Sequence, residues 1–101
     1  MAKFVRFRVM RGTTLRQVFS WEELGVDVNS IASVARQDIT SNGTTTAARF
    51  KCNILYEGLE VYLPATESQR LRNTNKFDIS VQLNNEYADV VAVLYGQIEV
   101  R

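Results

Sequence analysis

Apolar and polar residues alternate along most of the chain, and this period of two predicts β-strands. Residues 45–56 show the pattern most clearly, and residues 77–83 alternate without a break. Further strands are expected at residues 3–10, 14–19, 30–37, 59–63 and 88–101. The pairs Asn42-Gly43 and Glu57-Gly58 are typical of tight turns, because glycine readily adopts a positive φ. The pattern therefore predicts six or seven short strands joined by turns.

Two segments have the features of short helices. Ser20 and Glu23 have the spacing of a capping box, which predicts a helix of about one turn. A second capping box begins at Thr66 and favours a helix over residues 66–73, and the alternative for residues 66–75 is an irregular excursion. Together these features predict one mainly β domain over residues 1–101, a small, strongly bent antiparallel barrel with one or two short helical segments. An open sheet with one packed helix is the competing architecture.

The C-terminal run, residues 88–101, is apolar on both faces over half its length. One face is apolar throughout, and the other carries Val91, Val93 and Tyr95 before it turns polar. A strand of this kind is covered on both sides, by its own fold or by another subunit. We therefore predict an oligomer interface at Val91, Val93 and Tyr95. Gly96 in the middle of the strand indicates a bulge, a bend or a close backbone approach.

Basic residues are concentrated early in the chain, although the formal net charge is only +1. Arg6, Arg8, Arg11 and Arg16 all precede the first acidic residue. Guanidinium groups suit phosphate and carboxylate partners, and the neighbouring Phe4 could stack on a nucleotide base. The four arginines are therefore candidate nucleic-acid contacts. The alternative is an exposed edge strand that its charges keep soluble.

Catalytic and metal-binding patterns are missing from the sequence. It contains no histidine, and its one cysteine, Cys52, is expected to be a small buried apolar residue. No glycine-rich phosphate loop or metal-ligand cluster is present, and adjacent carboxylates such as Glu22 and Glu23 do not converge on a cleft. We expect no enzymatic activity, no metal and no cofactor. Because no apolar run approaches about 20 residues and no signal-peptide core is present, we expect a cytoplasmic protein without a membrane partner.

The segment Leu94-Tyr95-Gly96-Gln97-Ile98-Glu99-Val100 resembles the second sequence motif of the Sm/LSm-like small β-barrels. That motif is an apolar strand leading into Ile-Arg-Gly, two variable positions and another apolar residue. Tyr95 stands where the family usually has arginine, although bacterial members also use a tyrosine-bearing version. Residues 58–63 have the glycine and apolar spacing of the first motif, but Pro64 replaces its aspartate. The resemblance implies a bent five-stranded barrel of the Sm-like or SH3-like type that forms a ring, binds single-stranded RNA and places Tyr95, Gly96 and Gln97 in its base pocket.

The leading functional expectation is a non-catalytic, homo-oligomeric, ring-forming Sm-like protein that binds single-stranded RNA, in a setting such as the regulation of gene expression. The alternative is a small structural or assembly protein, such as a virion or phage accessory component, that uses the same surfaces for protein–protein contacts alone. The near-neutral charge and the many hairpins fit both equally. A third interpretation is a regulatory domain that binds a small ligand in the mouth of its barrel.

Overall fold

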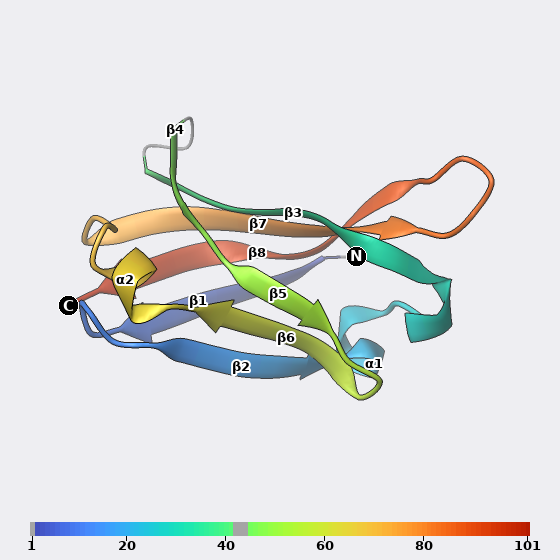
Figure 1. Cartoon of the computed structure of the whole chain (residues 1–101), viewed down its shortest axis with the longest axis horizontal. Helices are drawn as coiled ribbons and strands as arrows, with labels where there is room; N and C mark the ends of the chain where they lie inside the picture. The colour runs from blue at the N-terminus through green and yellow to red at the C-terminus, as the bar shows by residue number, and fades with distance from the viewer. Residues whose placement is uncertain (1, 42–44) are drawn as a thin grey trace.

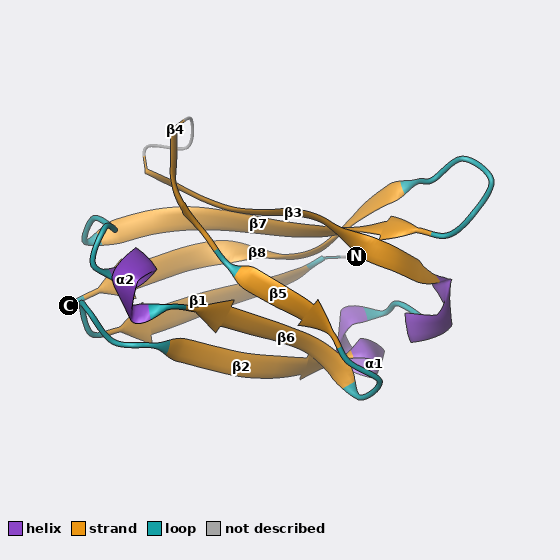
Figure 2. Cartoon of the chain, in the orientation of Figure 1, coloured by secondary structure: helices purple, strands orange, loops and turns teal. Residues whose placement is uncertain are grey.

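The computed structural model describes residues 2–41 and 45–101, and it is mainly β, as predicted (Figures 1 and 2). The predicted turn at Asn42-Gly43 lies outside the described residues. The strands are β1 (Lys3–Val9), β2 (Leu15–Ser20), β3 (Ile31–Ser41), β4 (Thr45–Arg49), β5 (Lys51–Ile54), β6 (Gly58–Leu63), β7 (Thr74–Leu83) and β8 (Val90–Val100). The short helices are α1 (Trp21–Leu24), the 3₁₀ turn η1 (Val28–Ser30) and α2 (Ala65–Ser68).

The strands form two separate sheets that pack face to face as a sandwich. The five-stranded sheet has the order β1-β8-β7-β3-β4, and the three-stranded sheet has the order β2-β6-β5. β1 is parallel to β8, and the other paired strands are antiparallel. Figure 1 shows the strands running along the long axis, with the turns gathered at the two ends of the molecule. The principal-axis extents are 40 × 27 × 20 Å.

The closed barrel predicted from the sequence is wrong, because the hydrogen-bonded order ends at β1 and β4 in one sheet and at β2 and β5 in the other. The strand expected over residues 45–56 explains part of the difference. It is interrupted at Phe50, where the chain leaves the five-stranded sheet as β4 and enters the three-stranded sheet as β5. The amide of Phe50 donates to the carbonyl oxygen of Gln37 at 3.0 Å, and the amide of Cys52 donates to the Gln37 side chain at 3.0 Å. Apolar and polar residues continue to alternate from β4 into β5. The sequence pattern therefore did not indicate that the chain passes from one sheet to the other at Phe50.

A cluster of phenylalanine rings joins the two sheets. The centroid of Phe7 lies 6.1 Å from that of Phe19, 6.0 Å from Phe50 and 5.3 Å from Phe77. All four rings are almost fully buried. Burial of one such side chain stabilises the folded state by roughly 1.5–3 kcal/mol, so this cluster is a large part of what holds the sheets together. Around it lie further fully buried apolar side chains: Ile39, Leu59, Val61, Leu63, Ile79, Val81, Val93, Leu94 and Ile98.

The first predicted helix is confirmed and the second is displaced. At α1 the Ser20 hydroxyl accepts from the Glu23 amide at 3.2 Å, and the Glu23 carboxylate accepts from the Ser20 amide at 2.9 Å. The helix expected over residues 66–73 is instead the single turn α2, which begins after Pro64 without a side-chain cap. The chain from Gln69 to β7 is irregular because its carbonyl groups bond to Arg11 rather than to a further helical turn.

β8, the C-terminal run singled out in the sequence, lies between β1 and β7. A shift of register opposite Ile79 and Ser80 turns both Val93 and Leu94 into the core, where each is 0% exposed. The proposed oligomer interface is therefore wrong at Val93, since this side chain is covered by its own fold. Val91 is half-buried and Tyr95 is exposed, so these two positions remain on the surface.

Gly96 is the point of closest approach between β1 and β8. Its φ is +156°, and a Cβ atom there would lie 1.8 Å from the carbonyl oxygen of Val5. No side chain fits at that distance, so only glycine allows the two backbones to pair here. Of the three roles predicted for this glycine, close backbone approach is the one that the structure shows.

Candidate functional site

The outer face of the five-stranded sheet brings together several of the predicted site residues. The register places Phe4 of β1 beside Tyr95 of β8, and Arg6 beside Gln97. Phe7, Leu94 and Ile98, which alternate with them in β1 and β8, are buried, so these side chains point outward. The same register continues onto β7, where Lys76 pairs with Gln97. A polar, basic row of Arg6, Gln97 and Lys76 therefore crosses three strands, next to an aromatic pair on β1 and β8 that is followed on β7 by Asp78.

The aromatic row is an exposed pair of rings. Phe4 is 50% exposed and Tyr95 is 47% exposed. Their centroids lie 5.4 Å apart with the planes at 69°, which is an edge-to-face contact. Such a pair is rigid relative to a single exposed ring and offers a large apolar area at little further cost in conformational entropy. We call Phe4, Tyr95, Arg6, Gln97 and Lys76 the β1–β8 face.

Charges of both signs lie around this pair, because Asp78 of β7 is the register partner of Tyr95 and forms an ion pair with Arg36 at 3.4 Å. Arg8 lies 3.2 Å from the carboxylate of Glu99, and Arg101 approaches the same carboxylate at 3.9 Å. Within the described part of the chain, Arg6 and Lys76 have no ion-pair partner. The sequence identified Arg6 and Arg8 as neighbours on one face, but Lys76 was missed because its place beside β8 depends on strand order.

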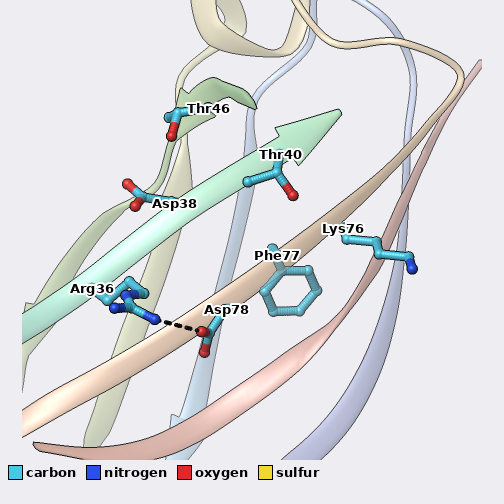
Figure 3. A pocket seen from close by; sticks show the side chains of 7 residues that line it. All are labelled: Arg36, Asp38, Thr40, Thr46, Lys76, Phe77 and Asp78. Atoms are coloured by element: carbon cyan, nitrogen blue, oxygen red, sulfur yellow. Dashed lines mark hydrogen bonds and ion pairs between the residues drawn. The ribbon is translucent and has the colours of Figure 1, made fainter. Parts of the chain in front are cut away.

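A shallow polar hollow lies on the same sheet, over β3, β4 and β7 (Figure 3). In it Arg36 pairs with Asp78 at 3.4 Å, and nearby Arg49 pairs with Asp38 at 3.0 Å. Each carboxylate is therefore neutralised by its own arginine. Figure 3 shows the Lys76 side chain directed away from the Arg36–Asp78 pair. The hollow provides polar contacts but no pair of free carboxylates for acid–base chemistry.

Arg11 does not join the β1–β8 face. Its guanidinium donates to the carbonyl oxygens of Leu71 and Gln69, the latter at 3.4 Å, and to the Asn73 side chain at 3.1 Å. These bonds hold the irregular segment between α2 and β7. Arg11 is therefore a structural residue, although the sequence grouped it with Arg6 and Arg8.

Arg16 lies on the three-stranded sheet. Its Nε donates to the Glu60 carboxylate at 2.7 Å, and the Asn53 side chain donates to the other Glu60 oxygen at 2.8 Å. The Asn53 hydrogen bond first, and then Arg16, hold the pKa of Glu60 below its usual range. The four arginines predicted to bind nucleic acid are therefore divided between two sheets and a loop.

The three residues expected to form a base pocket point in different directions. Tyr95 and Gln97 belong to the outer face, whereas Gly96 is buried between β1 and β8. Successive residues of a strand alternate sides, so Tyr95 and Gln97 share one face and Gly96 lies on the other. Gly96 therefore does not belong to the surface that Tyr95 and Gln97 form, and its role in binding stays a prediction.

The remaining candidate chemistry is limited. In residues 2–41 and 45–101 no group of three or more His, Cys, Asp or Glu residues could hold a metal ion. Burial raises the pKa of the Cys52 thiol to about 12, so it remains protonated and weakly reactive. None of the described helices has the length and apolar character needed to cross a membrane.

Comparison with known proteins identifies the architecture. No protein-family model matches the chain, and no curated protein matches it in sequence. A solved structure with a similar fold is the extracellular fragment, including the stalk region, of Novel Immune-Type Receptor 11 from Ictalurus punctatus. The TM-score is 0.50 at 11% sequence identity, over 100% of this chain and 87% of that chain. The fold is an immunoglobulin-like β-sandwich.

Strand order agrees with this assignment. The second, fifth and sixth strands form one sheet, and the third, fourth, seventh and eighth lie in the other, as B, D, E and C, C′, F, G do in variable-type immunoglobulin domains. The inter-sheet disulfide of antibody domains cannot form, because the chain has one cysteine. The resemblance to Sm-like barrels is therefore wrong, and the ring and RNA pocket that it implied lose their support.

Proposed function

We propose that this protein is a non-catalytic assembly module whose β1–β8 face binds a protein partner that carries exposed carboxylates. The observation that carries the proposal is the half-exposed Phe4–Tyr95 pair bordered by Arg6 and Lys76. Tyrosine and arginine are enriched among the residues that dominate protein–protein binding, while isolated exposed ion pairs contribute little. An apolar centre with a cationic border fits an apolar side chain flanked by Asp or Glu.

The dispersal of the arginines favours a protein over a nucleic acid. A single strand of RNA is held by a continuous basic groove that follows its backbone. Here Arg11 and Arg16 are occupied with the chain's own carbonyl and carboxylate groups, on other parts of the molecule. Arg6 and Lys76 form a short basic patch, which is sufficient for two or three carboxylates. A small structural or assembly component, such as a virion or phage accessory protein, is the setting that this role suits.

The test uses a library of random peptides displayed on phage, selected against the intact protein. We expect the selected peptides to combine Asp or Glu with an apolar residue. Tyr95→Ala should weaken their binding by roughly 30-fold, as truncation of an interface hot spot does. Tyr56→Ala is the matched control, because Tyr56 is 87% exposed in the β5–β6 turn, away from this face.

Two outcomes would overturn the proposal. One is that Tyr95→Ala and Tyr56→Ala affect the selected peptides equally, which would place binding elsewhere. The other is that the protein binds a single-stranded oligouridylate at moderate salt, with Arg6→Ala weakening that complex and lowering its salt dependence. That result would assign the face to nucleic acid.

A further inference from the structure

Figure 1 shows the turns gathered at the two ends of the long axis, and the charged residues at each end are mainly of one sign. One end comprises residues 20–30, 55–57 and 84–89, and we call it the acidic end. The other comprises residues 10–14, 64–73 and Arg101, and we call it the basic end. Because successive strands run back and forth along the long axis, segments far apart in sequence contribute to the same end.

The acidic end carries six exposed acids and, within its segments, no base. They are Glu22, Glu23, Asp27, Glu57, Glu86 and Asp89. Across the described residues, the one ion pair that any of them makes is between Glu23 and Lys3 of β1, at 3.2 Å. This end is therefore strongly negative.

The basic end carries four exposed arginines and one acid. They are Arg11, Arg70, Arg72 and Arg101. The acid, Glu67, is partly buried and lies 3.5 Å from Arg70. This end therefore remains positive after its internal pairing.

The sheets between the two ends carry no unpaired carboxylate among the described residues, whereas Arg6, Lys51 and Lys76 have no ion-pair partner there. Each carboxylate on a strand is paired with an arginine: Asp38 with Arg49, Glu60 with Arg16, Asp78 with Arg36, and Glu99 with Arg8. The molecule is 40 Å long, whereas salt screens charges beyond about 8–10 Å. The two ends therefore cannot neutralise each other within one molecule.

Exposed apolar side chains accompany the charges. At the acidic end Tyr56 is 87% exposed beside Glu57, and Tyr87 is 78% exposed beside Glu86. At the basic end Met10 is 70% exposed beside Arg11. Both ends thus combine apolar area with charge of one sign, and the signs are complementary.

We propose that copies of this chain associate end to end, with the basic end of one copy against the acidic end of the next. The contact is heterologous, since each copy contributes a different surface, and it extends into linear assemblies unless its rotation closes them. The ion pairs are solvent-exposed and individually weak, so the association is reversible and falls steeply with salt. This inference uses different residues from the β1–β8 face and does not depend on the function proposed for it.

Charge reversal tests the contact. Arg70→Glu with Arg72→Glu changes the basic end from three net positive charges to one net negative charge, and Glu57→Lys with Glu86→Lys reduces the acidic end from six net negative charges to two. All four side chains are exposed, and circular dichroism verifies that each variant is folded. Sedimentation velocity of the wild type at about 20 mM salt should show concentration-dependent species larger than a monomer, which dissociate at about 0.5 M salt.

Each variant alone should associate at least tenfold more weakly than the wild type, and an equimolar mixture of the two should associate again. The control is Arg6→Glu with Lys51→Glu, which makes the same change in net charge on the sheets and should associate like the wild type. A monomeric wild type at low salt, or a mixture that stays monomeric, would overturn the proposal. So would dissociation of the control variant, because the contact would then lie on the sheets.

Discussion

Replacing Gly96 with alanine should strongly destabilise the fold. The added Cβ would lie 1.8 Å from the carbonyl oxygen and 2.8 Å from the carbonyl carbon of Val5. These atoms belong to the backbone of β1, so no side-chain rotation can relieve the contact. β1 must withdraw from β8 by roughly 1.5–2 Å to restore an ordinary van der Waals distance.

The size of the effect follows from what that withdrawal breaks. β1 pairs with β8 from Lys3 to Val9, and Gly96 faces Val5 within that register. Loss of the two nearest interstrand hydrogen bonds costs about 1 kcal/mol each, and crowding of a packed site costs about 1–3 kcal/mol. The sum is about 3–5 kcal/mol, against a total stability of about 5–15 kcal/mol for a domain of this size.

Urea unfolding of the wild type, Gly96→Ala and Gly25→Ala measures this difference. Gly25 is the matched control, because its φ is +71° but no atom lies within 4 Å of the position of an added Cβ. Gly25→Ala should therefore cost only the left-handed backbone penalty, about 1–2 kcal/mol. Hydrogen exchange supplies a second measurement, since the amides of β1 and β8 should lose protection before those of β6.

The reasoning is refuted if the free energies of unfolding of the two alanine variants differ by less than about 0.5 kcal/mol. It is also refuted if Gly96→Ala is destabilised while β1 keeps its protection from exchange. In that case the strain would lie elsewhere than between these two strands.

Two further predictions concern titratable groups. The raised pKa of Cys52, about 12, should make its reaction with a disulfide reagent at pH 8 at least a hundredfold slower in the native protein than in denaturant; equal rates would contradict this. The hydrogen bond from Asn53, and then Arg16, lower the pKa of Glu60 in the folded state. Ionised Glu60 therefore stabilises the fold fully above the pKa of the unfolded state, near 4.3, and this contribution is lost as the pH falls through the pKa of the folded state. Glu60→Gln should therefore reduce the loss of stability between about pH 5 and pH 3, measured by thermal unfolding, and an unchanged pH profile would show that the Glu60 contacts are not maintained in solution.

Local features of the fold could be predicted from the sequence because neighbouring residues determine them. The capping box at Ser20 and the turn at Glu57-Gly58 both form as expected, and the strands follow the alternating pattern. Strand order could not be predicted in this way. The parallel pairing of β1 with β8 joins residues about 90 positions apart, and alternation shows only which side of a strand is buried.

The candidate site shows the same division. The alternation of apolar and polar residues correctly predicted that Arg6 and Arg8 share one face, since both belong to β1. It could not show that Arg11 bonds to the segment after α2, or that Arg16 lies on the other sheet beside Glu60. Residues that are close in sequence share a surface within one strand, but not where the chain turns from one sheet to the other.

The resemblance around Gly96 failed for a related physical reason. An apolar strand with one glycine indicates that another backbone passes close to that position. In this structure the backbone is that of Val5. Different folds can bring different strands to that glycine, so the motif does not identify the partner strand. In this chain the partner is β1, and its parallel pairing places Phe4 against Tyr95 and Arg6 beside Gln97. Gly96, which carries the resemblance to Sm-like barrels, is therefore also the residue that allows the proposed binding face to form.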